Sequence, residues 1–334
     1  MHMKNFVKAA LFALILCLCL LGLDRAMRRQ DGGAKYDAFF EEKQPFDVFF
    51  LGTSHMMDSV MPMELWRDFG FTSYNLANPA ETLEATYWTL RLALESHVPK
   101  AVVVDVCYLG KAQSEVATRT MGHLFMDEIP LSALKLRAIW ALYPEGERLE
   151  YVFPLASYHT RWEELFEKSE PMTAAEPITR GAELRCGRSS PAQYVRTAQM
   201  DLRETAGKQA LREIIALCRE RGVEVILTAI PYPADEETQR MMNSAGVIAQ
   251  ENGVPFLNLF DVPNLVDFET DCYDAASHLN PDGATKVTRH LGDYVVSRFG
   301  FENRREDPAY AHWEADLIDY QLLRQAQWGP YTKE

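Results

Sequence analysis

Five short apolar runs recur along the chain, and none of them shows the polar alternation of a half-exposed strand. The runs are rich in Val, Ile and Phe, which is typical of strands buried on both faces. Helical patterns lie between them, and three of these patterns stop at a glycine, a common residue at helix ends. The strand runs are 46–51, 72–76, 101–106, 223–230 and 255–259, and the helical patterns are 62–69, 79–96, 206–221 and 236–252. This order predicts an α/β fold with a central parallel sheet between layers of helices.

Two regions depart from the alternation of strands and helices. Residues 110–205 contain helical patterns at 132–143 and 151–166 and predict a helical insertion over the edge of the sheet. The tail, 307–334, carries aromatic and leucine residues that predict a C-terminal docking helix. The predicted α/β domain therefore spans residues 45–306.

The N-terminus begins with an uncharged apolar run at 9–23, which extends to residue 6 if Lys8 reaches the interface. No small-residue cleavage site follows this run, so we expect residues 1–29 to be a retained single-pass membrane anchor. Residues 30–44 are polar, contain Gly32 and Gly33, and predict a tether. Basic residues are more numerous after the run than before it, which on charge alone places the body in the cytoplasm.

Composition narrows the possible partners. The 334 residues carry a formal net charge of -14, and no cluster of Lys and Arg suited to phosphate groups is present, which argues against a nucleic-acid partner. The six cysteines are scattered without a CxxC pair, so neither a zinc site nor a disulfide framework is predicted. We expect no metal and no cofactor.

A candidate nucleophile and its base stand at opposite ends of the predicted domain. Ser54 lies in a turn, Gly52 to His55, directly after the first strand run, and His278 lies in a polar cluster far downstream. A serine hydroxyl needs an imidazole within hydrogen-bond reach to become a nucleophile near neutral pH. Two plainer interpretations stay open: a Gly-x-Ser turn is common in loops, and His278 is placed to cap a helix that begins near Asn280.

These segments, in this order, resemble the SGNH (GDSL-type) hydrolase superfamily. The resemblance covers about residues 46–299 and is greatest to a membrane-anchored bacterial branch similar to the D-alanyl transfer protein of teichoic-acid modification. The segments that carry it are FLGTSH (50–55), YNL (74–76), PKAVVVD (99–105), IPYP (230–233) and SHLNPDGA (277–284), with YHTRW (158–162) in the insertion. It implies a three-layer α/β/α, flavodoxin-like fold.

The resemblance also implies roles for particular residues. Ser54 is the nucleophile, His278 the general base, and an acid shortly before the histidine orients its ring. The superfamily spaces this pair as Asp-x-x-His, but position 275 is alanine here, so the acid is assigned to Asp274. Asp271 in its place, or a dyad without an acid, stays open.

The oxyanion hole of the superfamily uses the N–H of the nucleophile, a glycine N–H after the second strand and an asparagine after the third strand. The resemblance carries over Ser54 and, in place of the glycine, Ala80, with Asn78 as a further donor. The sequence 78–81 also has the cap residue, proline and acid typical of a helix N-terminus. Asp105 and Tyr108 occupy the third block.

Further side chains are predicted to contact the substrate: His55, Asn75, Asp105, Tyr108, His159 and Arg161. For His55 the plain alternative is a hydrogen-bonded core or surface residue. For Arg161 it is an ion pair with Glu163 or Glu164 on a solvated helix face.

The predicted function is that of a serine esterase or O-acyltransferase that forms a Ser54 acyl-enzyme and acts on a carbohydrate or polymer of the cell envelope. The resemblance implies an extracellular body and a membrane-bound acyl donor protein as partner. Two alternatives stay open: a catalytically degenerate scaffold of a polymer-modifying complex, and a cytoplasm-facing esterase.

Overall fold

A computed structural model describes residues 2–27, 33–116, 119–159, 177–189, 194–274 and 278–329. Its centre is a sheet of five parallel strands in the order β2-β1-β3-β4-β5. The strands are β1 (Val48–Leu51), β2 (Ser73–Asn75), β3 (Ala101–Asp105), β4 (Glu224–Ala229) and β5 (Phe256–Asn258). Each lies within one of the five apolar runs, so the predicted α/β class and parallel sheet are confirmed. The strand order changes direction between β1 and β3, and ligands of open α/β sheets bind at such a point.

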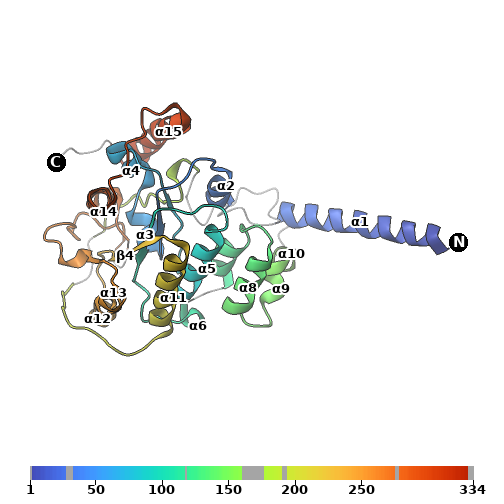
Figure 1. Cartoon of the computed structure of the whole chain (residues 1–334), viewed down its shortest axis with the longest axis horizontal. Coiled ribbons are helices and arrows are strands. Elements are labelled where there is room, and N and C mark those ends of the chain that lie inside the picture. The colour runs from blue at the N-terminus through green and yellow to red at the C-terminus, as the bar shows by residue number, and fades with distance from the viewer. Residues whose placement is uncertain are drawn as a thin grey trace.

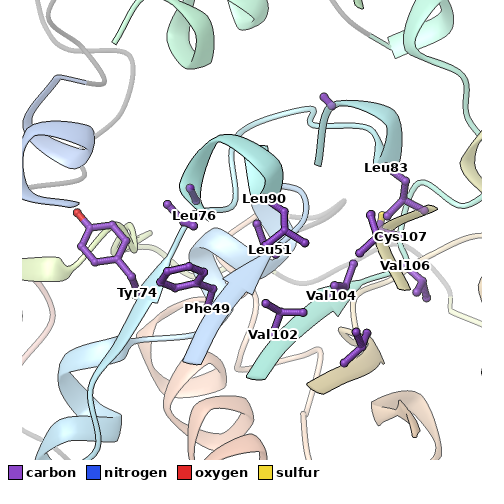
Figure 2. Close-up of a cluster of buried hydrophobic side chains, with 14 of the residues drawn as sticks. Phe49, Leu51, Tyr74, Leu76, Leu83, Leu90, Val102, Val104, Val106 and Cys107 are labelled. Atoms are coloured by element: carbon purple, nitrogen blue, oxygen red, sulfur yellow. The ribbon is translucent and has the colours of Figure 1, made fainter. Parts of the chain in front are cut away.

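Helices cover both faces of the sheet because successive strand residues point to opposite sides. Phe49 and Leu51 of β1 and Val102 and Val104 of β3 share one core cluster with Leu90, and Figure 2 shows these side chains between the strands and α5. The alternate residues belong to a second cluster on the opposite face. The first face carries α2 (Gly33–Glu41), α5 (Leu83–Ala93) and α11 (Ala206–Arg221), and the second carries α3 (Ser54–Ser59), α4 (Pro62–Phe69) and α14 (Pro281–Phe299).

Local signals set two helix boundaries to the residue. The helices α4 and α11 span 62–69 and 206–221 as predicted, and Gly70 and Gly222 end them in the left-handed conformation. The pattern at 236–252 instead forms two helices, α12 (Glu236–Asn243) and α13 (Ala245–Asn252). They meet at Ser244, whose hydroxyl donates to the carbonyl of Met241 at 2.6 Å and so competes with the helical bonding pattern.

The predicted helix at 79–96 starts later than expected. Ala80 has a φ of +54°, which a right-handed helix does not accommodate. Helix α5 begins at Leu83, after Thr82, whose side chain accepts a hydrogen bond from the N–H of Ala85 at 3.3 Å. The helix N-terminus predicted at 78–81 is therefore wrong, and these residues form a turn.

The N-terminal helix α1 (His2–Met27) projects from the body (Figure 1) and contains a segment, Lys4–Asp24, that is long and apolar enough to cross a membrane. Its last turn is docked: the carboxylate of Asp24 accepts the N–H of Leu155 at 2.6 Å, and both Asp24 and Met27 are buried. The predicted tether does not reach residue 44. Helix α2 occupies residues 33–41, and its Tyr36 and Phe39 lie in the main core because two aromatic residues three apart share one helix face.

The insertion is helical in its first part, where α8, α9 and α10 lie at the end of the body from which α1 leaves (Figure 1). Its helices are α6 (Gln113–Val116), α7 (Arg119–Met126), α8 (Ala133–Leu142), α9 (Arg148–Val152) and α10 (Leu155–Tyr158). The second predicted helix, 151–166, is interrupted between α9 and α10, and residues 160–166 lie outside the described part. The predicted docking helix is confirmed as α15 (Ala311–Gln327), which buries Trp313, Leu317 and Tyr320.

Candidate active site

Ser54 lies where a strand, a tight turn and a helix meet. Strand β1 ends at Leu51, and Gly52 follows with a φ of +144°. A Cβ atom at position 52 would lie 2.7 Å from the Cβ of Asp105, so both the conformation and the close approach require glycine. Thr53 then caps α3 by accepting the N–H of His55 at 3.2 Å, and Ser54 is the first residue of that helix. The hydroxyl thus stands at the carboxyl end of β1, beside the point where the strand order reverses.

His278 is within hydrogen-bond distance of Ser54. The Ser54 Oγ and His278 Nε2 atoms are 2.9 Å apart, and the other ring nitrogen, Nδ1, is 2.6 Å from Oδ2 of Asp274. The three groups therefore form a continuous hydroxyl, imidazole and carboxylate chain. A carboxylate on Nδ1 keeps the proton there and leaves Nε2 free to accept the serine proton.

The loop that carries His278 also holds Asp274 against the imidazole ring. Asp274 lies one residue further from the histidine than the spacing Asp-x-x-His would place the acid. Cys272 and Leu279 form an antiparallel bridge, and the N–H of Tyr273 donates to the carbonyl of His278 at 2.8 Å. Within this narrow loop the second oxygen of Asp274 accepts the backbone N–H of His278 at 3.1 Å. Asp274 and His278 are thus held together by these contacts, and residues 275–277 between them lie outside the described part of the chain.

The structure does not support the two alternative roles in this loop, Asp271 as the orienting acid and His278 as the helix cap. The side chain of Asp271 accepts from the Nζ of Lys286 at 3.0 Å and from the N–H of Asp267 at 2.8 Å, so it supports the loop. The cap of α14 is Asn280, whose Oδ1 accepts the N–H groups of Asp282 and Gly283. His278 is therefore not the helix cap.

Two backbone N–H groups are candidate oxyanion donors. The N–H of Ser54 has no partner within α3 because the first N–H groups of a helix never do. Ala80 is the third residue of a turn closed by a bond from Glu81 N–H to Asn78 O at 3.3 Å. Its positive φ, after Pro79, is the conformation that glycine usually adopts in type II turns. The donor role of Ala80 stays a prediction, and its backbone has a left-handed conformation, which glycine adopts most readily.

The predicted donor role of Asn78 is not supported. Its side-chain amide donates to the carbonyl of Leu76 at 3.0 Å and to the carboxylate of Glu81, and its oxygen accepts the hydroxyl of Tyr36 at 3.0 Å. Both amide hydrogens are therefore used to hold the turn of which Asn78 is the first residue.

Asn75 and Asp105 are structural, contrary to the predicted substrate contacts. Asn75 has no exposed surface, and its amide donates to the carbonyls of Met56 and Val60 at 2.9 Å, which ties the end of α3 to β2. Asp105 is 1% exposed and accepts from the Thr53 hydroxyl at 3.3 Å. Its burial raises the pKa of this carboxyl to about 7. An ionised Asp105 would repel an oxyanion, and burial weakens that objection because it favours the neutral form.

The ring of His55 lies against one face of the ring of His278. It is buried, and its ring stacks on Tyr232 with centroids 3.9 Å apart and on His278 at 5.5 Å. The His55 side chain therefore packs beside His278, and its contact with a substrate stays a prediction. Tyr108 is half-buried, and its burial raises the pKa of its phenol. Its contact with a substrate stays a prediction.

The predicted contacts in the insertion lie elsewhere. His159 is exposed at the end of α10 and bonds through Nδ1 to the carbonyl of Ala156 at 2.9 Å. Figure 1 shows α10 beside the end of α1 and separated from α3 and α14, which carry or adjoin Ser54 and His278. The structure therefore does not bring His159 to the Ser54 site, and its contact with a substrate stays a prediction. Arg161 lies outside the described residues.

One charged pair beside the site was not foreseen. Asp58, on α3, places Oδ2 3.8 Å from Nε2 of His278, and Arg185 approaches the same oxygen at 3.4 Å. The spacing between Ser54 and Asp58, one helical turn, is a signal the sequence contains, because residues four apart share a helix face. Arg185 carries no such signal, since it lies in an irregular segment in the second part of the insertion.

In the described ranges, no group of three or more His, Cys, Asp or Glu side chains is arranged to hold a metal ion.

The fold and site together define an α/β protein with a Ser-His-Asp arrangement at the carboxyl edge of a parallel sheet. No protein-family model matches the sequence, and a comparison with curated proteins finds no match. The interpretation of the site therefore depends on its geometry.

Proposed function

We propose that the protein is an SGNH-like serine esterase or O-acyltransferase that acts on a carbohydrate or polymer of the cell envelope. The observation that carries this proposal is the chain from Ser54 Oγ to His278 Nε2 at 2.9 Å and from His278 Nδ1 to Asp274 at 2.6 Å. Such distances are those of a nucleophile, its general base and an orienting acid. The flanking strand, glycine turn and helix support it, because they present the hydroxyl at the edge where α/β enzymes bind ligands.

The proposed reaction begins with the attack of Ser54 Oγ on the carbonyl carbon of an ester. The serine proton moves to Nε2 of His278. The carbonyl oxygen of the ester becomes an oxyanion, which the N–H groups of Ser54 and Ala80 stabilise. Collapse of this intermediate breaks the bond to the leaving alcohol, which takes the proton from Nε2. A Ser54 ester remains, and either water or a sugar hydroxyl then attacks it with His278 again as base.

The choice between hydrolysis and transfer depends on the acceptor. Both outcomes use the same nucleophile and base, so the site chemistry is common to them. Transfer to a polymer fits a body held at the membrane, and the contact of α1 with α10 through Asp24 supports a retained α1. We propose that the body is extracellular and receives its acyl group from a membrane-bound donor protein. A reporter fused to residue 334 tests the orientation: a signal confined to the cytoplasm contradicts it.

The decisive experiment is covalent labelling of the full-length protein in detergent micelles with a fluorophosphonate probe, followed by peptide mapping. We expect the probe on Ser54, and we expect Ser54→Ala and His278→Ala to remove it. p-Nitrophenyl acetate turnover, measured with and without an added sugar acceptor, then separates hydrolysis from transfer.

A scaffold without catalysis is the second candidate, and one observation favours it. The side chain of Asn78 is fully used, and the third block offers the carboxyl of Asp105 where the superfamily has an amide donor. If Ser54 remains unlabelled in a folded protein, and Ser54→Ala is silent in cells, the scaffold is the better description.

A further inference from the structure

A second carboxyl group faces the imidazole of His278 on the side that receives the serine proton. Asp274 contacts Nδ1, whereas Oδ2 of Asp58 lies 3.8 Å from Nε2, the nitrogen that Ser54 also contacts. Asp58 follows Ser54 by one turn of α3, so the same short helix presents both groups to one ring nitrogen. The imidazole therefore has a carboxyl group near each of its nitrogens.

The surroundings of Asp58 are those of a carboxylate. Its side chain has no exposed surface, and Nε of Arg185 lies 3.4 Å from Oδ2. Among the residues that the structure describes, Oδ1 has no hydrogen-bond partner. A buried oxygen without a partner is costly in either protonation state, so Oδ1 does not decide the charge. The contact of Oδ2 with the guanidinium of Arg185 is what favours the ionised form, against the effect of burial.

Other charges act on this carboxyl group. Burial raises the pKa of Asp58, and the charges of Glu183 and Asp274 raise it further, whereas the charge and hydrogen bond of Arg185 lower it. Glu183 also lies 3.2 Å from Nη2 of Arg185, and Lys35, buried on α2, interacts with Asp58 by charge. Arg185 is therefore the direct contact that opposes burial, and an imidazolium at His278 would add a second positive charge beside Oδ2.

We propose that Asp58, held ionised by Arg185, is a positioning residue that stabilises the imidazolium of His278 from the Nε2 side while Ser54 attacks. The serine proton moves to Nε2 and then to the leaving alcohol, and Asp58 accepts no proton in these steps. Its negative charge favours the charged ring and disfavours return of the proton to Ser54. This role rests on the proposed function, but the interaction between Asp58 and His278 is measurable without turnover.

The test follows the reaction of His278 with diethyl pyrocarbonate, which modifies the uncharged imidazole, in the full-length protein in detergent micelles. Peptide mass spectrometry gives the pH midpoint of modification at His278 alone. A nearby carboxylate favours the imidazolium, so Asp58→Asn is expected to move this midpoint to lower pH by about one unit, as a charge within about 4–6 Å does. An unchanged midpoint in folded Asp58→Asn protein overturns the proposal.

The matched control is Glu64→Gln. Glu64 is also a fully buried carboxyl group beside an arginine, Arg324 at 3.5 Å, but it faces α15. We expect no change of the His278 midpoint in this variant, and an equal shift in both variants contradicts a specific contact. If Asp58→Asn fails to fold by circular dichroism, Asp58→Asn with Arg185→Gln removes both charges of the pair. A smaller shift to lower pH is expected there, and no shift overturns the proposal.

A second readout separates this inference from the proposed function. The rate of Ser54 labelling by the fluorophosphonate is measured across the same pH range, and its acid limb is expected to move with the His278 midpoint. If the midpoint shifts but Ser54 is never labelled, the carboxylate interaction stands and the enzyme proposal fails. If Ser54 is labelled and the midpoint does not shift, the enzyme proposal stands and Asp58 has no such role.

Discussion

Within the described ranges, two sets of Ser, His and Asp side chains make the same sequence of contacts, and they differ in their surroundings. In the insertion, Ser157 Oγ is 3.2 Å from Nε2 of His123, whose Nδ1 is 2.9 Å from Asp127. The order of contacts matches that of Ser54, His278 and Asp274. Distances between the three side chains therefore do not distinguish the two sets.

The difference lies in what else the groups contact. The hydroxyl of Ser157 also donates to Glu150 at 3.0 Å, so its single proton is not reserved for His123. Its backbone N–H donates to the carbonyl of Pro154 at 2.8 Å, which leaves no donor for an oxyanion at that atom. Ser54, in contrast, begins a helix directly after a strand, where its N–H has no helical partner.

The packing of the two histidines differs in the same sense. His123 is 6% exposed, stacks on Tyr151 with centroids 4.3 Å apart and shares Asp127 with the hydroxyl of Tyr158. His278 keeps 21% of its side chain exposed. The set in the insertion therefore joins α7, α9 and α10, whereas the histidine of the set at the sheet edge is partly open to solvent. A triad is recognised by its donors and access as well as by its distances.

The largest difference between the two sets should appear when each serine is replaced by alanine. We expect Ser54→Ala to abolish covalent labelling by a fluorophosphonate, because the Ser54 hydroxyl is the group that contacts Nε2 of His278. Ser157→Ala should leave the labelling rate unchanged. In-gel fluorescence of the two variants measures this, and loss of labelling in Ser157→Ala would reverse the comparison.

The second largest difference should appear between substitutions of the two aspartates, Asp274 and Asp127. Asp274→Asn is expected to slow Ser54 labelling on the order of 10³–10⁴-fold, because the amide no longer favours the required tautomer of His278. The rate constant of labelling at a fixed probe concentration is the measurement. Asp127→Asn is the matched control in the insertion, and a comparable loss in that variant would contradict the assignment.

The buried carboxyl group of Asp105, beneath the Gly52–Thr53 turn, should make the stability of the protein depend on pH. Burial raises the pKa of Asp105 to about 7, whereas an aspartate in the unfolded chain titrates near pH 4. The folded protein therefore holds this proton more tightly, and its stability falls as pH rises from about 4 to about 7. We expect Asp105→Asn to reduce this loss in the free energy of unfolding by about 1–3 kcal/mol.

Urea unfolding in detergent at about pH 4 and about pH 8 measures the Asp105 effect, since the two values bracket the titration. An identical pH dependence in Asp105→Asn and the parent protein would show that this carboxyl does not titrate in the folded state.

The smallest expected effect is on stability, and it concerns the set Ser157, His123 and Asp127 in the insertion. Ser157→Ala removes a hydroxyl that joins Glu150 and His123, and we expect the free energy of unfolding to fall by about 1 kcal/mol. Thermal or urea unfolding of the full-length protein checks it. No change in stability would argue that these contacts are not what holds α10 in place.

Much of the α/β framework was predictable because its signals are local. The five apolar runs each contain a strand, and glycines at 70 and 222 end helices at the predicted residues. Ser54 and His278 were also recognisable, since each sits in a turn whose chemistry is visible in a few neighbouring residues. Helix α2 was missed because it follows the polar, glycine-containing stretch 28–33, and only the packing partners of Tyr36 and Phe39 make that segment part of the core.

The sequence by itself determined the parallel sheet, the apolar N-terminal helix and the two turns that carry the candidate nucleophile and base. The tertiary structure decided that Asp274 meets His278, that Asn75 and Asn78 hold the backbone, and that Asp58 and Arg185 adjoin the imidazole. Hydrophobic periodicity and turn chemistry act over a few residues, so a sequence displays them directly. Hydrogen bonds between side chains depend on which distant segments pack together, and several partners compete for each polar group until the fold is complete.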